Sequence, residues 1–191
     1  MQRDKWKALL VLLVFLAAGV AFVYGRVAGD SNPGDFEVRT ANYRLEDGHF
    51  EEAIREFESA LAKNPEHPGA HLGLAITLMQ MSRLEDAVAQ FDRVLAIDPD
   101  MAVAWADRGI AWDRLGQYEK ALADYRTALA LDATLAKGPG WLWRFLRNVD
   151  KTPPTVKDRA DYLEAELAKP ADERLLELPE EDTKQRMYKI D

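Results

Sequence analysis

Histidine is the side chain best suited to proton transfer or metal binding near neutral pH, and this sequence contains three histidines. His67 and His71 stand four residues apart, a spacing that on a helix puts two imidazoles on one face and could hold a zinc ion. Pro68 and Gly69 interrupt that spacing, and no glutamate of an HExxH motif lies between the two histidines. His49 and His67 fall in expected turns. We therefore expect no metal site and no catalytic histidine.

Other catalytic chemistry has no positive support in the sequence. The chain has no cysteine, which excludes disulfides, thiolate metal ligands and cysteine nucleophiles. It also has no glycine-rich phosphate loop, no GxSxG elbow and no distinctive pair of carboxylates. Acidic pairs such as Glu51 and Glu52 are explained as first-turn residues favoured by the helix dipole. We expect a non-enzymatic protein without a cofactor.

The residue types that most often dominate protein-protein binding gather in the segment 138–148, GPGWLWRFLRN. Tryptophan and arginine are enriched among the side chains that carry interface energy, so Trp141 and Arg144 are candidate partner-binding residues within the region 141–147. A second interpretation is that the aromatic rings close the end of a helical stack while the arginines meet acidic neighbours. The sequence leaves both open.

An internal repeat with a period of about 34 residues organises the chain before that segment. Each unit reads as an amphipathic helix, a turn, a second amphipathic helix and a break. Small residues at fixed places would let two helices approach closely, and large ones would fill the space between units. The columns in register are Gly48, Ser82 and Gly116; Ala53, Ala87 and Ala121; Phe57, Phe91 and Tyr125; and Pro65, Pro99 and Ala133.

The second helices, HFEEAIREFESALAKNP, RLEDAVAQFDRVLAIDP and QYEKALADYRTALALDA, resemble those of the tetratricopeptide repeat family. The third unit matches the family pattern closely, with Trp105 and Gly109 at two characteristic positions. The first and second units depart from it, with Glu37 and His71 at the position of Trp105. The resemblance covers more than half of the chain.

The fold class expected is all-α: an N-terminal transmembrane helix, for which residues 8–25 are the candidate, followed by a superhelix of three repeat units and C-terminal capping helices. The superhelix and its cap are what the resemblance implies. The capping region includes the amphipathic segment TVKDRADYLEAELAK. The expected organisation is a cytoplasmic stub and anchor at 1–29, a linker at 30–35, repeats at 36–135 (about 34–67, 68–101 and 102–135), capping helices at 136–169, and a tail at 170–191.

The resemblance implies that the first helix of each unit lines a concave surface that binds protein partners. This surface is expected to be largely apolar with a few charges, and Ile76 and Met79, if exposed, would suit a helix or an extended apolar segment of a partner. Some family members grip a terminal carboxylate there, but the corresponding residues here are Val38, Asn42, Gly73, Val103 and Asp107, which argues against such a clamp. The candidate partner-binding residues on this surface are Val38, Asn42, Leu72, Ile76, Met79, Ile110, Asp113 and Arg114.

The N-terminus carries a candidate membrane anchor, because residues 8–25 contain no charge for 18 residues. A helix of that length is about 27 Å long, close to the hydrocarbon thickness of a bilayer. Three basic residues precede the segment, which predicts a cytoplasmic N-terminus and a repeat domain outside the cytoplasm, in the bacterial inner membrane and periplasm. A cleaved signal peptide is the alternative, and it exports the same domain.

A net charge of -8 argues against nucleic acid as a partner. The function expected is that of a membrane-tethered adaptor or scaffold that assembles envelope or membrane protein complexes, similar in layout to cytochrome c maturation subunits that capture apoproteins. The alternative is a permanent structural subunit of a larger membrane enzyme complex. The two differ in their interfaces, since a lasting one should be large and apolar.

Overall fold

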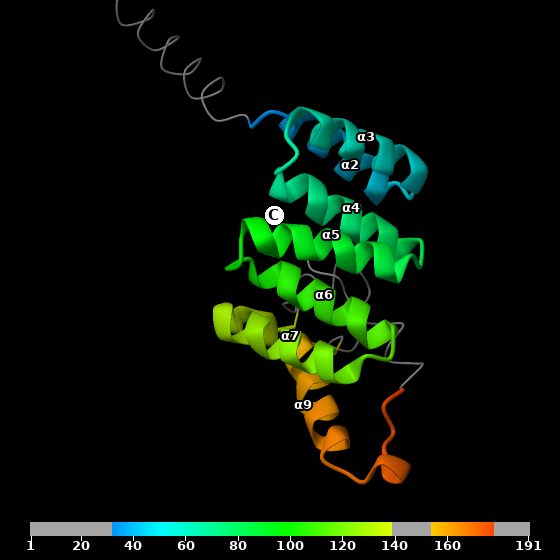
Figure 1. The fold of residues 1–191 in the computed structure, drawn as a ribbon, viewed down its shortest axis with the longest axis vertical. Coiled ribbons are helices and arrows are strands. Elements are labelled where there is room, and N and C mark those ends of the chain that lie inside the picture. Colours follow the sequence, from blue (N-terminus) through cyan, green and yellow to red (C-terminus); the bar gives the residue numbers. More distant parts are fainter. Residues whose placement is uncertain (1–31, 139–153, 178–191) are drawn as a thin grey trace, which may run out of the picture.

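A computed structural model describes residues 32–138 and 154–177, which form seven α-helices and two short 3-10 helices. Antiparallel pairs follow one another along the long axis of the molecule (Figure 1). The helices are α2 (Asp35–Glu46), α3 (Phe50–Lys63), α4 (Pro68–Gln80), α5 (Leu84–Ile97), α6 (Ala102–Arg114), α7 (Tyr118–Leu131) and α9 (Val156–Leu167), with η1 (Ala133–Ala136) and η2 (Ala171–Glu173).

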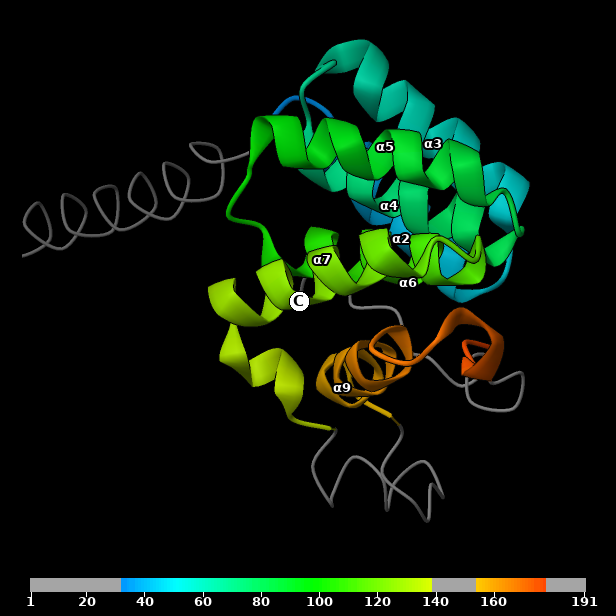
Figure 2. The same cartoon turned by 60° about the horizontal axis from the view of Figure 1, so that its bottom comes forward.

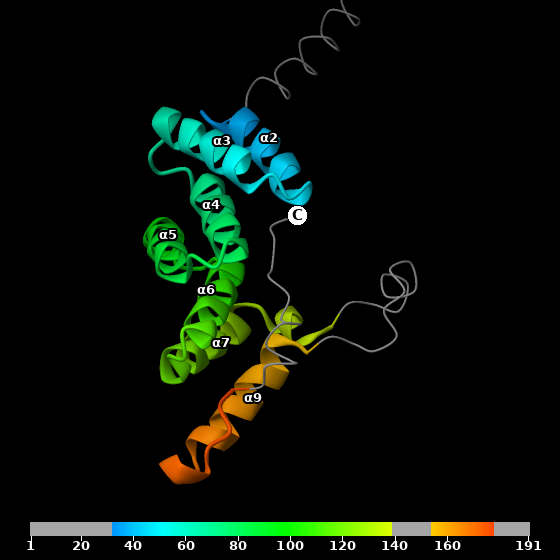
Figure 3. The same ribbon diagram turned by 90° about the vertical axis from the view of Figure 1, so that its right-hand side faces the viewer.

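Two rows of helices build the array. Each helix packs most extensively on its pair partner, and α3 packs on α4 as α5 packs on α6. Figure 3 shows α2, α4 and α6 in an inner row, with α3 and α5 in an outer row. Each of the first two expected units therefore contributes one helix to each row, and the described residues form the all-α array expected from the repeat.

The core follows the small and large columns of the repeat. Ala53, Ala87 and Ala121 are fully buried, as are Phe57, Phe91 and Tyr125. The Phe57 ring of α3 lies so close to the backbone of α4 at Gly73 that a Cβ atom built on this glycine would be 2.2 Å from Cζ of Phe57. The first unit thus inserts its aromatic ring directly against the backbone of the second.

The turn inside each unit has the same backbone geometry. Gly48, Ser82 and Gly116 all adopt a left-handed conformation, with φ angles of 78°, 59° and 70°. After Gly48, the amide of His49 donates to the carbonyl of Arg44 at 2.8 Å, and the amide of Gly48 donates to Leu45 at 3.1 Å. This pair of bonds is the Schellman ending of a helix, which favours glycine at the left-handed residue.

Ser82 is the one residue of that column with a side chain, so Ser82→Gly is expected to raise the free energy of unfolding by about 0.5–1 kcal/mol. Glycine removes the steric cost of the positive φ angle, offset in part by the larger freedom of the unfolded chain. Chemical denaturation followed by circular dichroism measures the change. Gly48→Ser is the matched control and should shift stability the other way, since a Cβ there meets nothing within 4 Å and only the backbone matters.

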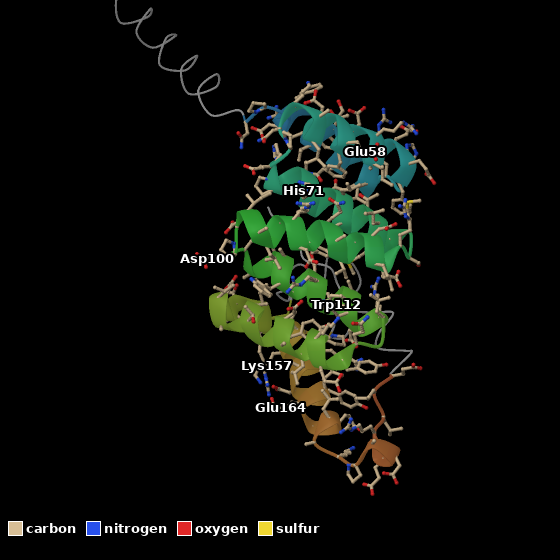
Figure 4. The ribbon with its side chains drawn as sticks, in the orientation of Figure 1. Glu58, His71, Asp100, Trp112, Lys157 and Glu164 are labelled. Atoms are coloured by element: carbon tan, nitrogen blue, oxygen red, sulfur yellow. The ribbon has the colours of Figure 1, made fainter. Side chains whose placement is uncertain are left out.

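A recurring hydrogen bond joins successive units. Nε1 of Trp105 donates to the carbonyl of Pro99 at 2.8 Å, and Nε2 of His71 lies 2.9 Å from the carbonyl of Pro65. Because a carbonyl can only accept, His71 (labelled in Figure 4) donates from Nε2. Its other nitrogen lies 2.8 Å from the side-chain amide group of Gln90 on α5. His71 therefore makes the same kind of hydrogen bond to a preceding proline carbonyl as Trp105, which holds the equivalent position in the third unit.

Helix α9 covers the end of the stack. It packs on α7 and η1, on the side of α6 and α7 that faces away from α5 (Figure 2). Thr155 and Asp158 form a capping box that fixes the first turn of α9. Val156, Ala160 and Leu163 are buried against the array, so the amphipathic segment expected in the capping region does form a helix.

Two expectations fall outside the described residues: the membrane span at 8–25 and the aromatic segment with Trp141 and Arg144. Within residues 32–138 and 154–177, no helix is long and apolar enough to cross a bilayer.

Candidate protein-binding face

Eight of the candidate binding residues lie on the three helices of the inner row. We call this set the inner face. It consists of Val38 and Asn42 on α2, Leu72, Ile76 and Met79 on α4, and Ile110, Asp113 and Arg114 on α6. Contacts of α4 with both α2 and α6 make the three helices one continuous row (Figure 3).

The inner face is polar and exposed at its two ends and apolar and buried in its middle. Asn42 and Arg114 are exposed, and Val38 is half-buried. In contrast, Ile76 is 3% exposed and Met79 1%, and Leu72 and Ile110 are also buried. The condition attached to Ile76 and Met79, that they be exposed, is therefore not met in the described structure. A side chain of that type in a well-packed array contributes to stability whether or not it also meets a partner.

Asp113, a candidate partner-binding residue, is buried and bonded within the chain. Its carboxylate accepts two hydrogen bonds from the guanidinium of Arg159 on α9, both of 2.7 Å. The hydroxyl of Tyr125 donates to the same carboxylate at 3.1 Å. The ion pair is buried on both sides, with 6% of the arginine side chain and 2% of the aspartate side chain exposed. Asp113 thus fixes the end of the inner face to the capping helix.

Arg159 is the functional residue that sequence reasoning missed. The signal was present, because Val156, Arg159, Ala160 and Leu163 follow the spacing of a buried helix face. A charged residue inside such a stripe calls for a buried partner of opposite sign.

Arg159 and its neighbours also hold the chain that follows α9. A third hydrogen bond from the Arg159 guanidinium reaches the carbonyl of Leu176 at 3.0 Å, and the hydroxyl of Tyr162 donates to the carbonyl of Leu175 at 2.6 Å. The amide of Leu175 donates to Oε2 of Glu166 at 2.8 Å. Residues 174–177 therefore run alongside α9 and come back toward α6.

Acidification is expected to release this returning segment. The Leu175 amide and the ammonium of Lys169, which lies 2.5 Å from Oε1, lower the pKa of Glu166 below its ordinary value of 4.5. A lowered pKa in the folded state stabilises the contact above pH 4.5, and the contact weakens as the pH falls through the folded value. As the pH falls below 4.5, hydrogen exchange of the Leu175 amide should become faster relative to its intrinsic rate.

Glu166→Gln is the control for that titration, because the amide keeps an acceptor for Leu175 and no longer ionises. In this variant the exchange protection of Leu175 should not change with pH. A pH dependence that persists in Glu166→Gln would assign the effect to another group and contradict the prediction.

A second charged cluster ties the middle of the array together. Arg108 on α6 bonds both carboxylate oxygens of Asp124 on α7, at 2.7 and 2.9 Å, and reaches Asp92 on α5 at 2.6 Å. Its guanidinium also lies 4.6 Å from the ring centre of Trp105. Burial raises the pKa of the Asp124 carboxyl, while the guanidinium of Arg108 opposes that shift. This cluster cross-links three helices, so we assign it to the scaffold.

The histidines have structural partners. Nδ1 of His67 accepts a hydrogen bond from the amide of Ala70 at the start of α4, so Nε2 carries the proton and donates to Asp35 at 2.9 Å. His67 and His71 consequently contact different partners and do not form one site. Within the described ranges, no cluster of three or more potential ligand side chains could hold a metal ion.

Comparison with known proteins agrees with this architecture. Two models of the tetratricopeptide repeat match the chain, at residues 44–107 and 102–135. No curated protein matches the sequence significantly.

Solved structures with the same fold include the first tetratricopeptide domain of Spaghetti (RPAP3) bound to the HSP90 peptide SRMEEVD, at 21% identity and a TM-score of 0.52. That match covers 63% of this chain and 92% of the other. The second such domain of RPAP3, bound to the same peptide, matches at 23% identity and a TM-score of 0.51, covering 53% and 94% of the two chains. The Arabidopsis OM64 domain matches at 20% identity and a TM-score of 0.52, covering 53% and 84%.

Proposed function

Because this chain is a tetratricopeptide repeat protein, we propose that its array is a non-enzymatic interaction scaffold that takes a segment of a protein partner against the inner face. The observation that supports this most is the composition of α4. Its residues from Leu72 to Met79 are all buried, including the three that lie at inner-face positions. Packing between two outer helices does not by itself require an apolar residue at every position around a helix.

The related structures suggest what kind of segment fits. Two of them hold a peptide, SRMEEVD, in the domain that resembles this one. The present array differs in charge, since Val38, Gly73, Val103 and Asp107 occupy the places expected for clamp residues. An acidic terminus is therefore a poor fit, and an apolar segment with basic residues is a better one.

The setting that we propose is a membrane surface. The uncharged run at 8–25 would anchor the protein with a cytoplasmic N-terminus, and the array would then face the periplasm. In that position it would act as an adaptor in the assembly of envelope or membrane protein complexes. An impermeant maleimide tests the topology in spheroplasts of a strain carrying Glu58→Cys, which places the only thiol on the outer helix α3 (Figure 4). Labelling without lysis is expected; labelling only after lysis would contradict it.

Photocrosslinking in cells tests the binding face. Probes replace Asn42 and Arg114, the exposed ends of the inner face, in the full-length protein, with a matched probe at the exposed Ala62 on α3. We expect a defined adduct at both inner positions and none at Ala62. Equal adducts at all three positions, or none at the inner ones, would overturn the proposal. Membranes solubilised and diluted before irradiation separate the two alternatives: a loss of crosslinking indicates an exchanging adaptor, whereas unchanged crosslinking indicates a permanent subunit.

A further inference from the structure

Helix α2 presents two aromatic rings to solvent on one face. Phe36 and Tyr43 are 68% and 70% exposed and stand two helical turns apart, with the exposed Arg39 between them. We call these three residues the α2 stripe. Aromatic and arginine side chains are enriched where a protein surface meets another molecule or a membrane. The stripe therefore has the composition of a contact surface.

The repeat shows what this face of a first helix does in the later units. Gly73, at the place of Arg39, lies against the ring of Phe57 on α3, so this side of α4 faces the unit before it. The places of the two aromatic rings are taken in α4 and α6 by small, fully buried residues: Ala70, Thr77, Ala104 and Ala111. The α2 stripe is thus the face by which a unit joins its predecessor, and it is open to solvent at the start of the described array.

The α2 stripe is not shaped to take another repeat unit. Small residues let two helices approach closely at this face of α4 and α6, whereas three large side chains keep an approaching helix further away. Two aromatic side chains of about 150–250 Å² each, about two-thirds exposed, offer roughly 200–350 Å², against about 800 Å² per partner in a standard protein interface. A surface that needs only shallow burial of the rings fits better than a second copy or a folded partner.

A bilayer surface lies within reach of the stripe. Nine residues, 26–34, separate the uncharged run at 8–25, which we propose as the anchor, from the start of α2. They span at most about 30 Å when extended, so the start of α2 stays near the point where the anchor leaves the membrane. The rest of the stack leads away from α2 toward α9 (Figure 1). Among the described helices, α2 is therefore the one placed to meet lipid.

The charges in the first half of α2 also favour a membrane on this side. Asp35 accepts a hydrogen bond from Nε2 of His67 at 2.9 Å, and the buried Glu37 accepts one from Nζ of Lys63 at 2.6 Å. Both acidic residues are therefore paired within the array. Arg39 forms no ion pair with any residue of the described ranges, so its positive charge is available to anionic headgroups.

We propose that the α2 stripe docks on the bilayer, with Phe36 and Tyr43 at headgroup level and Arg39 on anionic lipid phosphates. The exposed acidic residues Glu46 and Asp47 follow Tyr43, so the N-terminal half of α2 lies closest to the lipid. The inference rests on the proposed function in one respect, the membrane setting. A second contact besides the anchor would fix the orientation of the array, and with it that of the inner face, relative to the membrane.

The test measures how near α2 lies to lipid in the full-length protein, reconstituted in vesicles of phosphatidylethanolamine and phosphatidylglycerol. An NBD fluorophore is attached to Thr40→Cys, one turn from each ring of the stripe, and the chain has no other thiol. We expect spin-labelled lipid to lower its emission on the order of twofold, because a probe at headgroup level lies within quenching range. Ala62→Cys on α3 is the matched control. It adjoins Lys63, which bonds Glu37 at the start of α2, but it is exposed on the outer row and should not be quenched.

A second variant separates the stripe from mere proximity to the anchor. Phe36→Ser, Arg39→Ser and Tyr43→Ser together should abolish quenching at Thr40→Cys and leave the circular dichroism unchanged, since all three side chains are exposed. Equal quenching in this variant, or at Ala62→Cys, would overturn the proposal. A probe at Thr40→Cys that is shielded from water but not quenched by lipid would overturn it in favour of a protein partner.

Flotation of the vesicles on a density gradient distinguishes failure of this inference from failure of the proposed function. Protein that floats with the vesicles and shows no quenching at Thr40→Cys would overturn the docking of α2 and leave the membrane setting intact. Protein that does not float would overturn the membrane setting of the proposed function, and this inference with it.

Discussion

Replacing Arg159 with methionine is expected to lower the free energy of unfolding by about 3–5 kcal/mol. The change withdraws the guanidinium from the Asp113 carboxylate, of which 2% is exposed, so a buried charge loses its cation. Methionine keeps much of the aliphatic volume, which limits the contribution of a cavity. Urea denaturation of the purified protein measures the loss, and the same variant should release residues 174–177 to proteolysis.

Two variants separate the buried charge from other effects at this contact. Asp113→Asn combined with Arg159→Met removes the buried charge and keeps an acceptor for the Tyr125 hydroxyl, so it should regain much of the lost stability. Arg126→Met breaks the ion pair with Glu164 that joins α7 to the same capping helix at the surface, where 55% and 60% of the side chains are exposed. That change should cost less than about 1 kcal/mol. Equal losses in Arg126→Met and Arg159→Met would contradict the assignment.

The second large effect is expected for Phe57→Ala, which should cost about 3–5 kcal/mol. The ring is fully buried and lies against the backbone of α4 at Gly73, so its removal leaves a cavity between the first two units. The loss should appear in chemical denaturation as a lower midpoint with an early transition in α2 and α3, which would detach from the rest of the array. A loss below about 1 kcal/mol would mean that the helices collapse into the space.

Gly73→Ala tests the same contact from the other side. Alanine in a helix interior ordinarily stabilises by about 1 kcal/mol relative to glycine. Here the added Cβ would lie 2.2 Å from Cζ of Phe57, so we expect a loss of about 1–3 kcal/mol instead. Combining Gly73→Ala with Phe57→Leu should recover part of that loss, and additive losses would contradict a direct clash.

Much of the array could be predicted from the sequence, because residues that recur at the same place in each unit indicate which side chains pack together. The alanine column and the large aromatic column fix which faces meet, and the glycine and serine column fixes the turns. The role of His71 was less accessible, since a histidine at the tryptophan position reads as a departure from the pattern. Only the structure shows that its ring reaches the same kind of carbonyl as Trp105 does.

The inner face was harder to predict than the fold. Register places Ile76 and Met79 correctly on the inner row, but periodicity cannot say whether a side chain on that row is open or covered. The pairing of Asp113 with Arg159 spans 46 residues and joins the array to a helix outside the repeat, so no repeat column could reveal it. Contacts that do not recur from unit to unit can be identified only from the three-dimensional structure.

The hydrogen bond that joins successive units also bears on how such a chain can change its length. Residues 68–101 begin with a donor, His71, for the preceding proline carbonyl, and end with Pro99, the acceptor for the following donor. Residues 68–101 thus carry a hydrogen-bond donor at their start and the matching acceptor at their end. Tandem duplication of residues 68–101 would add one helix to each row and place Pro99 of one copy before His71 of the next, a joint of the same kind as the two present. Small-angle scattering would show the product as a longer particle.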